Sequence, residues 1–268
     1  MRSKCIALII LYFAFSMKTI IKVSNLVKRY GELEAVKGIS FEVYEGEIFG
    51  LLGPNGAGKT TTLEIIETLR EKTSGEVQVD GMSIDTDKQG IKQTIGVQLQ
   101  SAGYYPNLNL VELIHLFAGL YNEDVDAGAM LQRVGLEDKS KSKYKELSGG
   151  QKQRFSITTT LINKPKIVFL DEPTTGLDPQ ARRNLWELIR EIRDKGTTVV
   201  LTTHYMDEAE NLCDRVAIID SGRIISIDTP DRLIDHLVAS GFERAKEIKK
   251  ASLEDVFLNL TGKEWKDE

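Results

Sequence analysis

Short apolar runs alternate along the chain with longer segments in which apolar residues recur every three or four positions. Five runs rich in β-branched residues predict strands at residues 39–44, 47–52, 166–170, 197–202 and 215–219. Several of these runs are unbroken enough to be buried on both faces, which is typical of parallel sheets covered by helices. The pattern therefore predicts an α/β fold with a mainly parallel sheet.

The predicted helices carry residues that begin and end helices. Asp178 can cap a helix that has Pro179 at its first position, and Gly196 ends that helix. Its apolar face consists of Leu185, Leu188, Ile189 and Ile192. Strands and helices thus alternate as they do in βαβ units.

The middle of the chain, residues 101–163, lacks strand signals. Residues 111–120 and 151–161 instead show the periodicity of short helices. This segment is predicted to be a helical subdomain inserted into the α/β core.

Two more helices are expected in a C-terminal extension, residues 228–268. The first covers residues 230–238, and the second covers 252–260, where Ser252 and Asp255 fit a capping box. The second helix has an apolar face, for which packing into the core is preferred to a partner interface.

The chain begins with an apolar segment, residues 5–15, preceded by Arg2 and Lys4. It resembles the start of a signal peptide but has no small-residue cleavage site, and it is shorter than the roughly 20 residues that span a membrane. An internal start at Met17, with residues 1–16 as a mis-assigned extension, is preferred to a membrane anchor. No other apolar run is long enough for the chain to form a pore.

Charge and cysteine content narrow the class of partner. The 40 acidic and 35 basic residues give a net charge of −5, and no basic run is long enough for a nucleic-acid-binding arm. Nucleic acid is therefore not an expected partner. Cys5 and Cys213 form neither a metal-binding pattern nor a disulfide framework, which fits a reducing cytosol.

A phosphate-binding loop, GPNGAGKT, directly follows the strand predicted at residues 47–52. Its glycines let successive N–H groups point at phosphate oxygens, and the following helix adds its N-terminal dipole. Lys59 supplies a positive charge to the β- and γ-phosphates of ATP, and Thr60 is a better Mg²⁺ ligand than Thr61. The expected ATP contacts here are Gly53, Pro54, Asn55, Gly56, Ala57, Gly58, Lys59, Thr60 and Thr61.

Two carboxylates follow another predicted strand, in the sequence IVFLDEP at residues 167–173. Ligands bind at the carboxyl ends of strands in open α/β sheets. Asp171 is therefore expected to hold Mg²⁺, directly or through water, and Glu172 to polarise the water that attacks the γ-phosphate.

A third motif, LSGGQ at residues 147–151, has the features of a Ser-capped helix start and hence of another anion site. The phosphate loop, this motif, the carboxylate pair, the segment 176–178 and His204 occur in an order and spacing that resemble the ABC-type ATPases. The resemblance covers roughly residues 20–227 and implies a P-loop NTPase core with an inserted helical subdomain and an antiparallel β portion. Residues 17–227 are accordingly expected to form the nucleotide-binding domain.

The resemblance also implies a head-to-tail dimer, either of this chain or with a similar ATPase, in which two ATP molecules are sandwiched. Residues of the third motif would contact the γ-phosphate of ATP held by the other subunit. Asp178 would lie on the loop that crosses the dimer, although capping a helix explains it equally. The motif residues concerned are Ser148, Gly149, Gly150 and Gln151.

Three further residues take roles from the resemblance. His204 would hold the γ-phosphate and the attacking water. Gln100 would sense Mg²⁺ and couple to a membrane subunit, with Gln98 as the rival because no proline precedes Gln100 in the usual place. Tyr30 would stack on adenine, and an exposed tyrosine ending a strand is an almost equally good interpretation.

Three functions from different classes remain as candidates. A P-loop kinase would not need LSGGQ or the pair Glu172 and His204. A non-transport ABC-type ATPase of DNA repair or translation usually carries coiled coils or two ATPase domains. Residues 172–183, 202–210 and 252–262 resemble ATPases of bacterial exporters of drugs, sodium ions or lipid-linked polymers. The preferred prediction is an exporter ATPase at the cytoplasmic face of the membrane, attached to a separately encoded permease.

Overall fold

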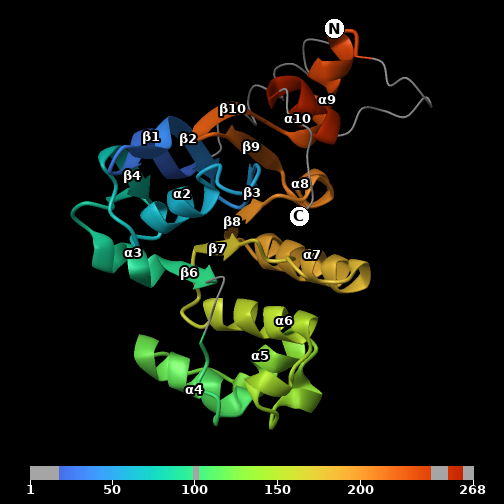
Figure 1. Cartoon of the computed structure of the whole chain (residues 1–268). Coiled ribbons are helices and arrows are strands. Elements are labelled where there is room, and N and C mark those ends of the chain that lie inside the picture. Colours follow the sequence, from blue (N-terminus) through green and yellow to red (C-terminus); the bar gives the residue numbers. More distant parts are fainter. Residues whose placement is uncertain (1–17, 99–102, 243–252, 262–268) are drawn as a thin grey trace, which may run out of the picture.

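The computed structural model describes residues 18–98, 103–242 and 253–261. The central element is a six-stranded sheet in the order β10-β9-β3-β8-β7-β6 (Figure 1). The pairs β9–β3, β3–β8, β8–β7 and β7–β6 are parallel, and only β10 is antiparallel to its neighbour. The mainly parallel sheet is therefore confirmed. Its strands are β3 Ile48–Leu52, β6 Ile95–Gln98, β7 Ile167–Asp171, β8 Thr198–Thr203, β9 Arg215–Asp220 and β10 Arg223–Asp228.

The predicted antiparallel portion is a separate four-stranded sheet in the order β2-β1-β4-β5. Its strands are β1 Thr19–Tyr30, β2 Leu33–Tyr44, β4 Ser74–Val79 and β5 Met82–Ser83. The strand predicted at residues 39–44 is present. These residues end β2, in which buried and more exposed positions alternate because only one face packs on the core.

The first helix after the phosphate loop, α2 Lys59–Ile66, contacts strands of both sheets. Its apolar side chains Leu63, Ile65 and Ile66 share a buried cluster with Phe49 and Leu51 of β3. The start of α2 is thereby held rigidly against the carboxyl end of the parallel strands.

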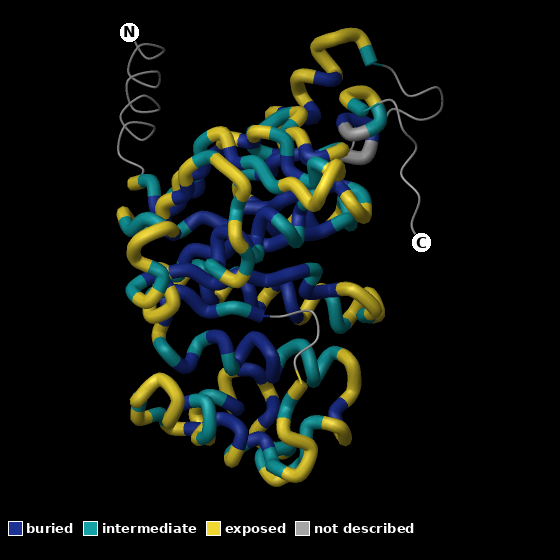
Figure 2. The backbone as a smooth tube through the Cα atoms, turned by 60° about the vertical axis from the view of Figure 1, so that its left-hand side comes forward, coloured by how far each residue is buried: buried dark blue, intermediate teal, exposed yellow. Residues whose placement is uncertain are grey.

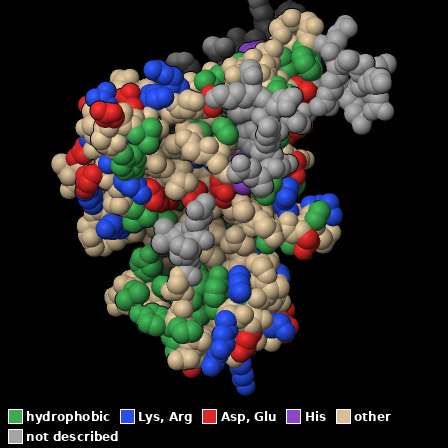
Figure 3. All heavy atoms as spheres, in the orientation of Figure 1, with side chains coloured by type: hydrophobic (Ala, Val, Ile, Leu, Met, Phe, Trp, Pro, Cys, Tyr) green, Lys and Arg blue, Asp and Glu red, His purple; other side chains and the backbone are tan. Residues whose placement is uncertain are grey.

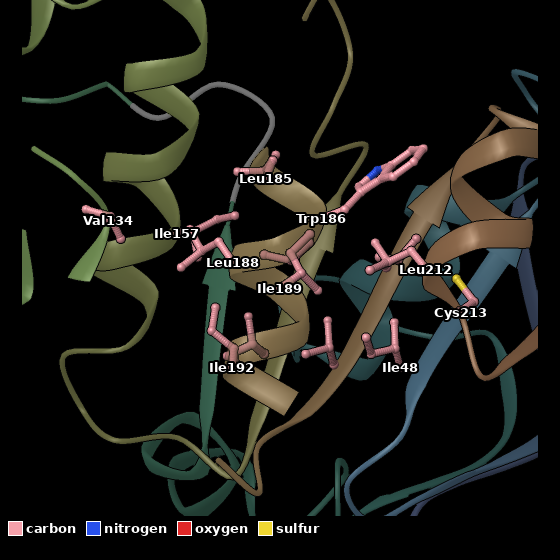
Figure 4. Close-up of a cluster of buried hydrophobic side chains, with 14 of the residues drawn as sticks. Ile48, Val134, Ile157, Leu185, Trp186, Leu188, Ile189, Ile192, Leu212 and Cys213 are labelled. Atoms are coloured by element: carbon pink, nitrogen blue, oxygen red, sulfur yellow. The ribbon is translucent and has the colours of Figure 1, made fainter. Parts of the chain in front are cut away.

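The other side of the six-stranded sheet is covered by α7 Pro179–Asp194 and α8 Met206–Leu212. Asp178 caps α7 and Pro179 is its first residue, as predicted. The predicted apolar face of α7 lies toward Ile157 and Ile48 in the second buried cluster (Figure 4).

The segment predicted to be helical contains α4 Leu110–Tyr121, α5 Ala127–Arg133 and α6 Gly149–Thr160, with short 3₁₀ turns at Glu137–Lys139 and Tyr144–Glu146. These helices lie together at one end of the molecule (Figures 1 and 2). Between residues 103 and 163 the described chain forms no strand. The helices predicted at 111–120 and 151–161 are present, and α6 begins earlier because Ser148 and Gln151 form a capping box.

Two helices follow β10 in the described part of the chain. One is α9 Pro230–Ala239, capped by Thr229, and the other is α10 Leu253–Thr261, which packs on α9 and α8. Val256 of α10 is buried in the core, which supports packing as the role of this apolar face. Ser252 of the predicted capping box and the leader 1–16 lie outside the described residues. A helix long and apolar enough to cross a membrane is not found in the described part.

The remaining helix, α3 Lys88–Thr94, runs directly into β6. Strands β4, β5, β6 and β10 were not predicted, and of β1 only its end at Tyr30 was. The short strands β5 and β6 give little periodicity, and the pairing of β1 with β2 is interrupted by register shifts.

Candidate functional site

The loop between β3 and α2 has a backbone that only glycine permits at two positions. At Gly53, an added Cβ would lie 2.1 Å from the carbonyl oxygen of Ile219. Gly58, which caps α2, has a φ of +99°, and its Cβ would lie 2.6 Å from the carbonyl oxygen of Ala35. The loop is therefore packed directly against the backbone of Ala35 and Ile219. The N-terminus of α2 faces the loop.

Lys59, the first residue of α2, is only 4% exposed. Its ammonium donates to the carbonyl oxygens of Gly53 (2.8 Å) and Pro54 (3.2 Å), and it lies 3.5 Å from Glu172 Oε1. Burial lowers the pKa of Lys59, and the carboxylates of Glu172 and Asp171 oppose that shift. The loop thus holds one buried cation among oriented backbone groups.

An oxygen cluster lies beside Lys59. Both carboxylate oxygens of Asp171 lie 3.2 Å from the Thr60 hydroxyl, and the Thr202 hydroxyl donates to Oδ1 of Asp171. Burial raises the pKa of Asp171, and the two hydroxyl hydrogen bonds act in the opposite direction. Thr60, rather than Thr61, faces the carboxylate. Hard oxygen ligands of this kind fit Mg²⁺, which commonly takes only one or two protein side chains together with substrate phosphates.

Glu172 has a backbone φ of +48°, which is uncommon for a residue with a side chain. Its N–H donates to the hydroxyl of Thr202 on the neighbouring strand (3.0 Å). Glu172 Oε2 lies 3.3 Å from Nδ1 of His204, although the two are not aligned for a hydrogen bond. As predicted, His204 at the end of β8 lies at the same sheet edge as the carboxylates that end β7.

The hollow in front of the phosphate loop has a volume of about 480 Å³. Tyr30, Leu33 and Ala35 line it together with the loop and Glu172. Tyr30 ends β1, is 40% exposed and lies beside Lys28 and Arg70. Tyr30 therefore ends a strand and also lines this hollow, and its stacking on adenine stays a prediction.

The LSGGQ residues line a different hollow, of about 210 Å³, with Gly176, Leu177 and Asp178. No residue lining this hollow also lines the one at the phosphate loop. Asp178 accepts the N–H groups of Gln180 and Ala181, so its capping role is real, and it also reaches the hollow. Within one chain the two glycine-rich motifs do not form one site.

Gln100 lies outside the described residues. Gln98, its rival, is buried at the end of β6, and its amide donates to Gln153 Oε1 of α6 (2.7 Å). Gln98 therefore connects the six-stranded sheet to the helical subdomain.

Thr202 is a site residue that was not predicted from the sequence. It is fully buried, donates to Asp171 and accepts from the backbone of Glu172, so it positions both carboxylates. A polar residue near the end of an otherwise apolar buried strand is the sequence signal that could have indicated it.

Thr202→Val is therefore expected to lower the rate of ATP hydrolysis about 10-fold or more, because a hydrogen bond to a charged group contributes about 1.5–3 kcal/mol. The measurement is steady-state hydrolysis by the purified variant. Thr198→Val is the matched control, since Thr198 is buried on the same strand and bonds to Gly46 at the other end. Equal losses in the two variants would contradict a specific role for Thr202.

A third hollow, of about 500 Å³, lies between β6 and the end of α4, and we call it the subdomain groove. Its lining includes Glu67, Leu69, Lys92, Leu120 and Tyr121. Glu67 is only 3% exposed, and burial raises its pKa to about 8, with the nearby carboxylates of Asp171 and Glu64 adding to the shift.

Glu67 should make stability depend on pH. Between the ordinary pKa of 4.5 and the folded value of about 8, the unfolded chain loses a proton that the folded chain keeps. The free energy of unfolding of the wild type should therefore fall relative to Glu67→Gln as pH rises from 5 to 8, by on the order of a few kcal/mol at most. Urea unfolding of both proteins at several pH values measures this, and parallel curves would contradict it.

The fold and the site together define a phosphate-loop ATPase: a buried lysine, a hydroxyl–carboxylate pair and a second carboxylate meet where parallel strands end. Comparison with known proteins gives the family. Residues 36–175 match the family model described as ABC transporter. The chain therefore belongs to the ABC transporter family, in which it is an ATP-binding subunit.

Similar curated proteins are likewise named as ATP-binding proteins. The chain is 38% identical to the linearmycin resistance ATP-binding protein LnrL of Bacillus subtilis, covering 89% of this chain and 77% of the relative. It is 35% identical to the Nod factor export ATP-binding protein I of Burkholderia orbicola, covering 91% and 97%. Identity to the daunorubicin resistance ATP-binding protein DrrA3 of Streptomyces coeruleorubidus is 37%, covering 80% and 70%.

Similar solved structures are also ATP-binding subunits or cassettes of ABC transporters. An ATP-binding subunit of an ABC transporter superposes with a TM-score of 0.77 at 28% identity, covering 91% of this chain and all of that one. A dimeric bacterial ABC transporter cassette superposes with a TM-score of 0.70 at 29% identity, covering 78% and 98%. The same cassette has also been solved bound to ADP and Pi, in a post-hydrolysis state.

Proposed function

We propose that this ATPase drives an exporter whose membrane-spanning permease is a separate polypeptide. The observation that carries the proposal is the buried cluster of Lys59, Asp171 and Glu172 in front of a hollow of about 480 Å³, which suits a nucleotide. Relatives named for linearmycin resistance, Nod factor export and daunorubicin resistance support export as the direction.

In the proposed mechanism, the phosphate loop and Lys59 bind the β- and γ-phosphates of ATP. Thr60 and Asp171 would hold Mg²⁺, with Gln100 as a further ligand, and the bound ion would neutralise charge on these phosphates. Glu172 accepts a proton from the attacking water, and His204 positions that water and the γ-phosphate. Tyr30 stacks on the adenine.

The proposed functional unit is a head-to-tail dimer, of two copies or of this chain with a similar ATPase. Support comes from the separation of the two glycine-rich motifs, since the hollow lined by Ser148 and the hollow lined by Lys59 share no lining residue. Ser148, Gly149, Gly150, Gln151 and Asp178 would complete the ATP site of the other subunit. ATP then closes the dimer, and hydrolysis opens it.

The subdomain groove is the proposed docking surface for the permease. Large exposed hydrophobic residues occur at its rim, and Figure 3 shows apolar side chains gathered over the end of the molecule that holds α4. Docking there would place the protein at the cytoplasmic face of the membrane, held by its partner. The segment with Gln100 would link the groove to the ATP site.

Copurification tests this function against a non-transport role in DNA repair or translation. The chain is co-expressed with each membrane protein found to be encoded beside its gene, and any complex is extracted in detergent. We expect a stable complex whose ATP hydrolysis differs from that of the isolated chain. No association with any neighbouring membrane protein would contradict the transporter role and favour the alternative.

A further inference from the structure

The floor of the subdomain groove holds a carboxyl group that lacks a cation. Glu67 is 3% exposed, and within the described residues it forms no ion pair or hydrogen bond through its side chain. The charges that act on it most are the carboxylates of Asp171 and Glu64. Burying such a group without a counter-charge is unfavourable.

The nearby cations do not compensate Glu67. Arg70 is held by Glu64, with Nε and Oε2 2.5 Å apart. Lys92 lines the same groove, but no ion pair joins it to Glu67 in the described chain. The groove therefore offers a buried carboxyl group without a counter-charge, and a cation that enters would stabilise its ionised form.

The rim of the groove is apolar. Leu120 is 74% exposed, and Leu69 and Tyr121 are also exposed. An apolar rim around a buried acid fits a short amphipathic helix whose apolar side chains cover the rim while one lysine or arginine reaches the floor.

We propose that Glu67 recognises a lysine or arginine on a cytoplasmic helix of the membrane partner and is a specificity determinant of that complex. This inference rests on the proposed function, because it takes the permease as the occupant of the groove. Entry of the cation compensates the ionised carboxylate, and a partner with an acidic residue at that place is rejected.

The position of Glu67 also links partner binding to the ATP site. Glu67 is the residue at which α2 ends, and α2 begins at Lys59 and Thr60 of the phosphate loop. The Glu67 carboxyl is also close enough to Asp171 for their charges to interact. A cation paired with Glu67 therefore lies one short helix away from the phosphates.

The test uses the full chain and the membrane protein encoded beside its gene. Glu67→Gln keeps the shape and removes the charge, and Glu67→Lys reverses it. Glu64→Gln is the matched control, because Glu64 lies on the same helix and is already paired with Arg70. Affinity for the detergent-solubilised membrane protein is measured for each variant, after circular dichroism shows that each one folds.

We expect Glu67→Gln to weaken binding about 30-fold or more, as loss of one partner of a buried charge pair does, and Glu67→Lys to abolish it. Glu64→Gln should bind like the wild type. In the Glu67→Lys background, changing one cytoplasmic Lys or Arg of the membrane protein to Glu should restore binding.

Equal binding by the wild type and both Glu67 variants would overturn the inference while leaving the transporter role intact. Failure of every charge reversal to restore Glu67→Lys would overturn it too. If Glu67→Gln instead changes self-association of the isolated chain in sedimentation, the occupant is a second copy and the inference is wrong. Absence of binding by the wild type itself would refute the proposed function.

Discussion

Glu172→Gln is expected to lower the rate of ATP hydrolysis by about 10²- to 10⁴-fold, the usual contribution of a general base, with little loss of ATP affinity. Glutamine keeps the size of the side chain but cannot accept the proton of the attacking water. The substitution should be tolerated structurally, because the Glu172 backbone is held by its bonds to Thr202 and not by its side chain. Single-turnover hydrolysis and ATP titration measure the two effects separately.

The same variant should accumulate as an ATP-bound dimer. ATP would still bridge Lys59 of one subunit and Ser148 of the other, while the wild type hydrolyses ATP and separates. Size-exclusion chromatography with and without ATP shows this change. Hydrolysis by Glu172→Gln at the wild-type rate would refute the assigned base, and Asp178 and His204 would be the next groups to replace.

Lys59→Ala is expected to reduce ATP affinity by at least about 10- to 100-fold, since each hydrogen bond to a charged group contributes roughly 1.5–3 kcal/mol. Lys59 is the cation on the phosphate loop itself, and its ammonium already lies between loop carbonyls and Glu172. The variant also leaves Glu172 without its cation, which adds repulsion toward the triphosphate. Calorimetric titration with ATP measures the loss.

Lys28→Ala is the control for Lys59→Ala. Lys28 lies over the ring of Tyr30, which lines the same hollow, but it donates to the carbonyl oxygen of Glu71. It should bind ATP nearly as the wild type does. Similar losses in both variants would mean that general positive charge, and not a loop-bound ammonium, holds the phosphates.

Much of the fold follows from local signals. The buried strands β3, β7, β8 and β9 are unbroken apolar runs, and α7 has both its cap and its first-turn proline in the sequence. The antiparallel sheet was expected only from family resemblance. Its strands alternate, bulge and pair with strands far away in sequence, so no short window of residues defines them.

The sequence by itself determined where the candidate chemistry lies: which loop is predicted to bind phosphate, which strand end carries the carboxylates, and that His204 lies at the same sheet edge. Each of these depends on residues adjacent in the chain or on the shared carboxyl edge of parallel strands. Only the tertiary structure decided that Thr202 positions both carboxylates, because that contact joins neighbouring strands. It also revealed the unpaired Glu67 at the floor of the subdomain groove, because burial and the absence of a cation depend on how α2, β6 and α4 pack together.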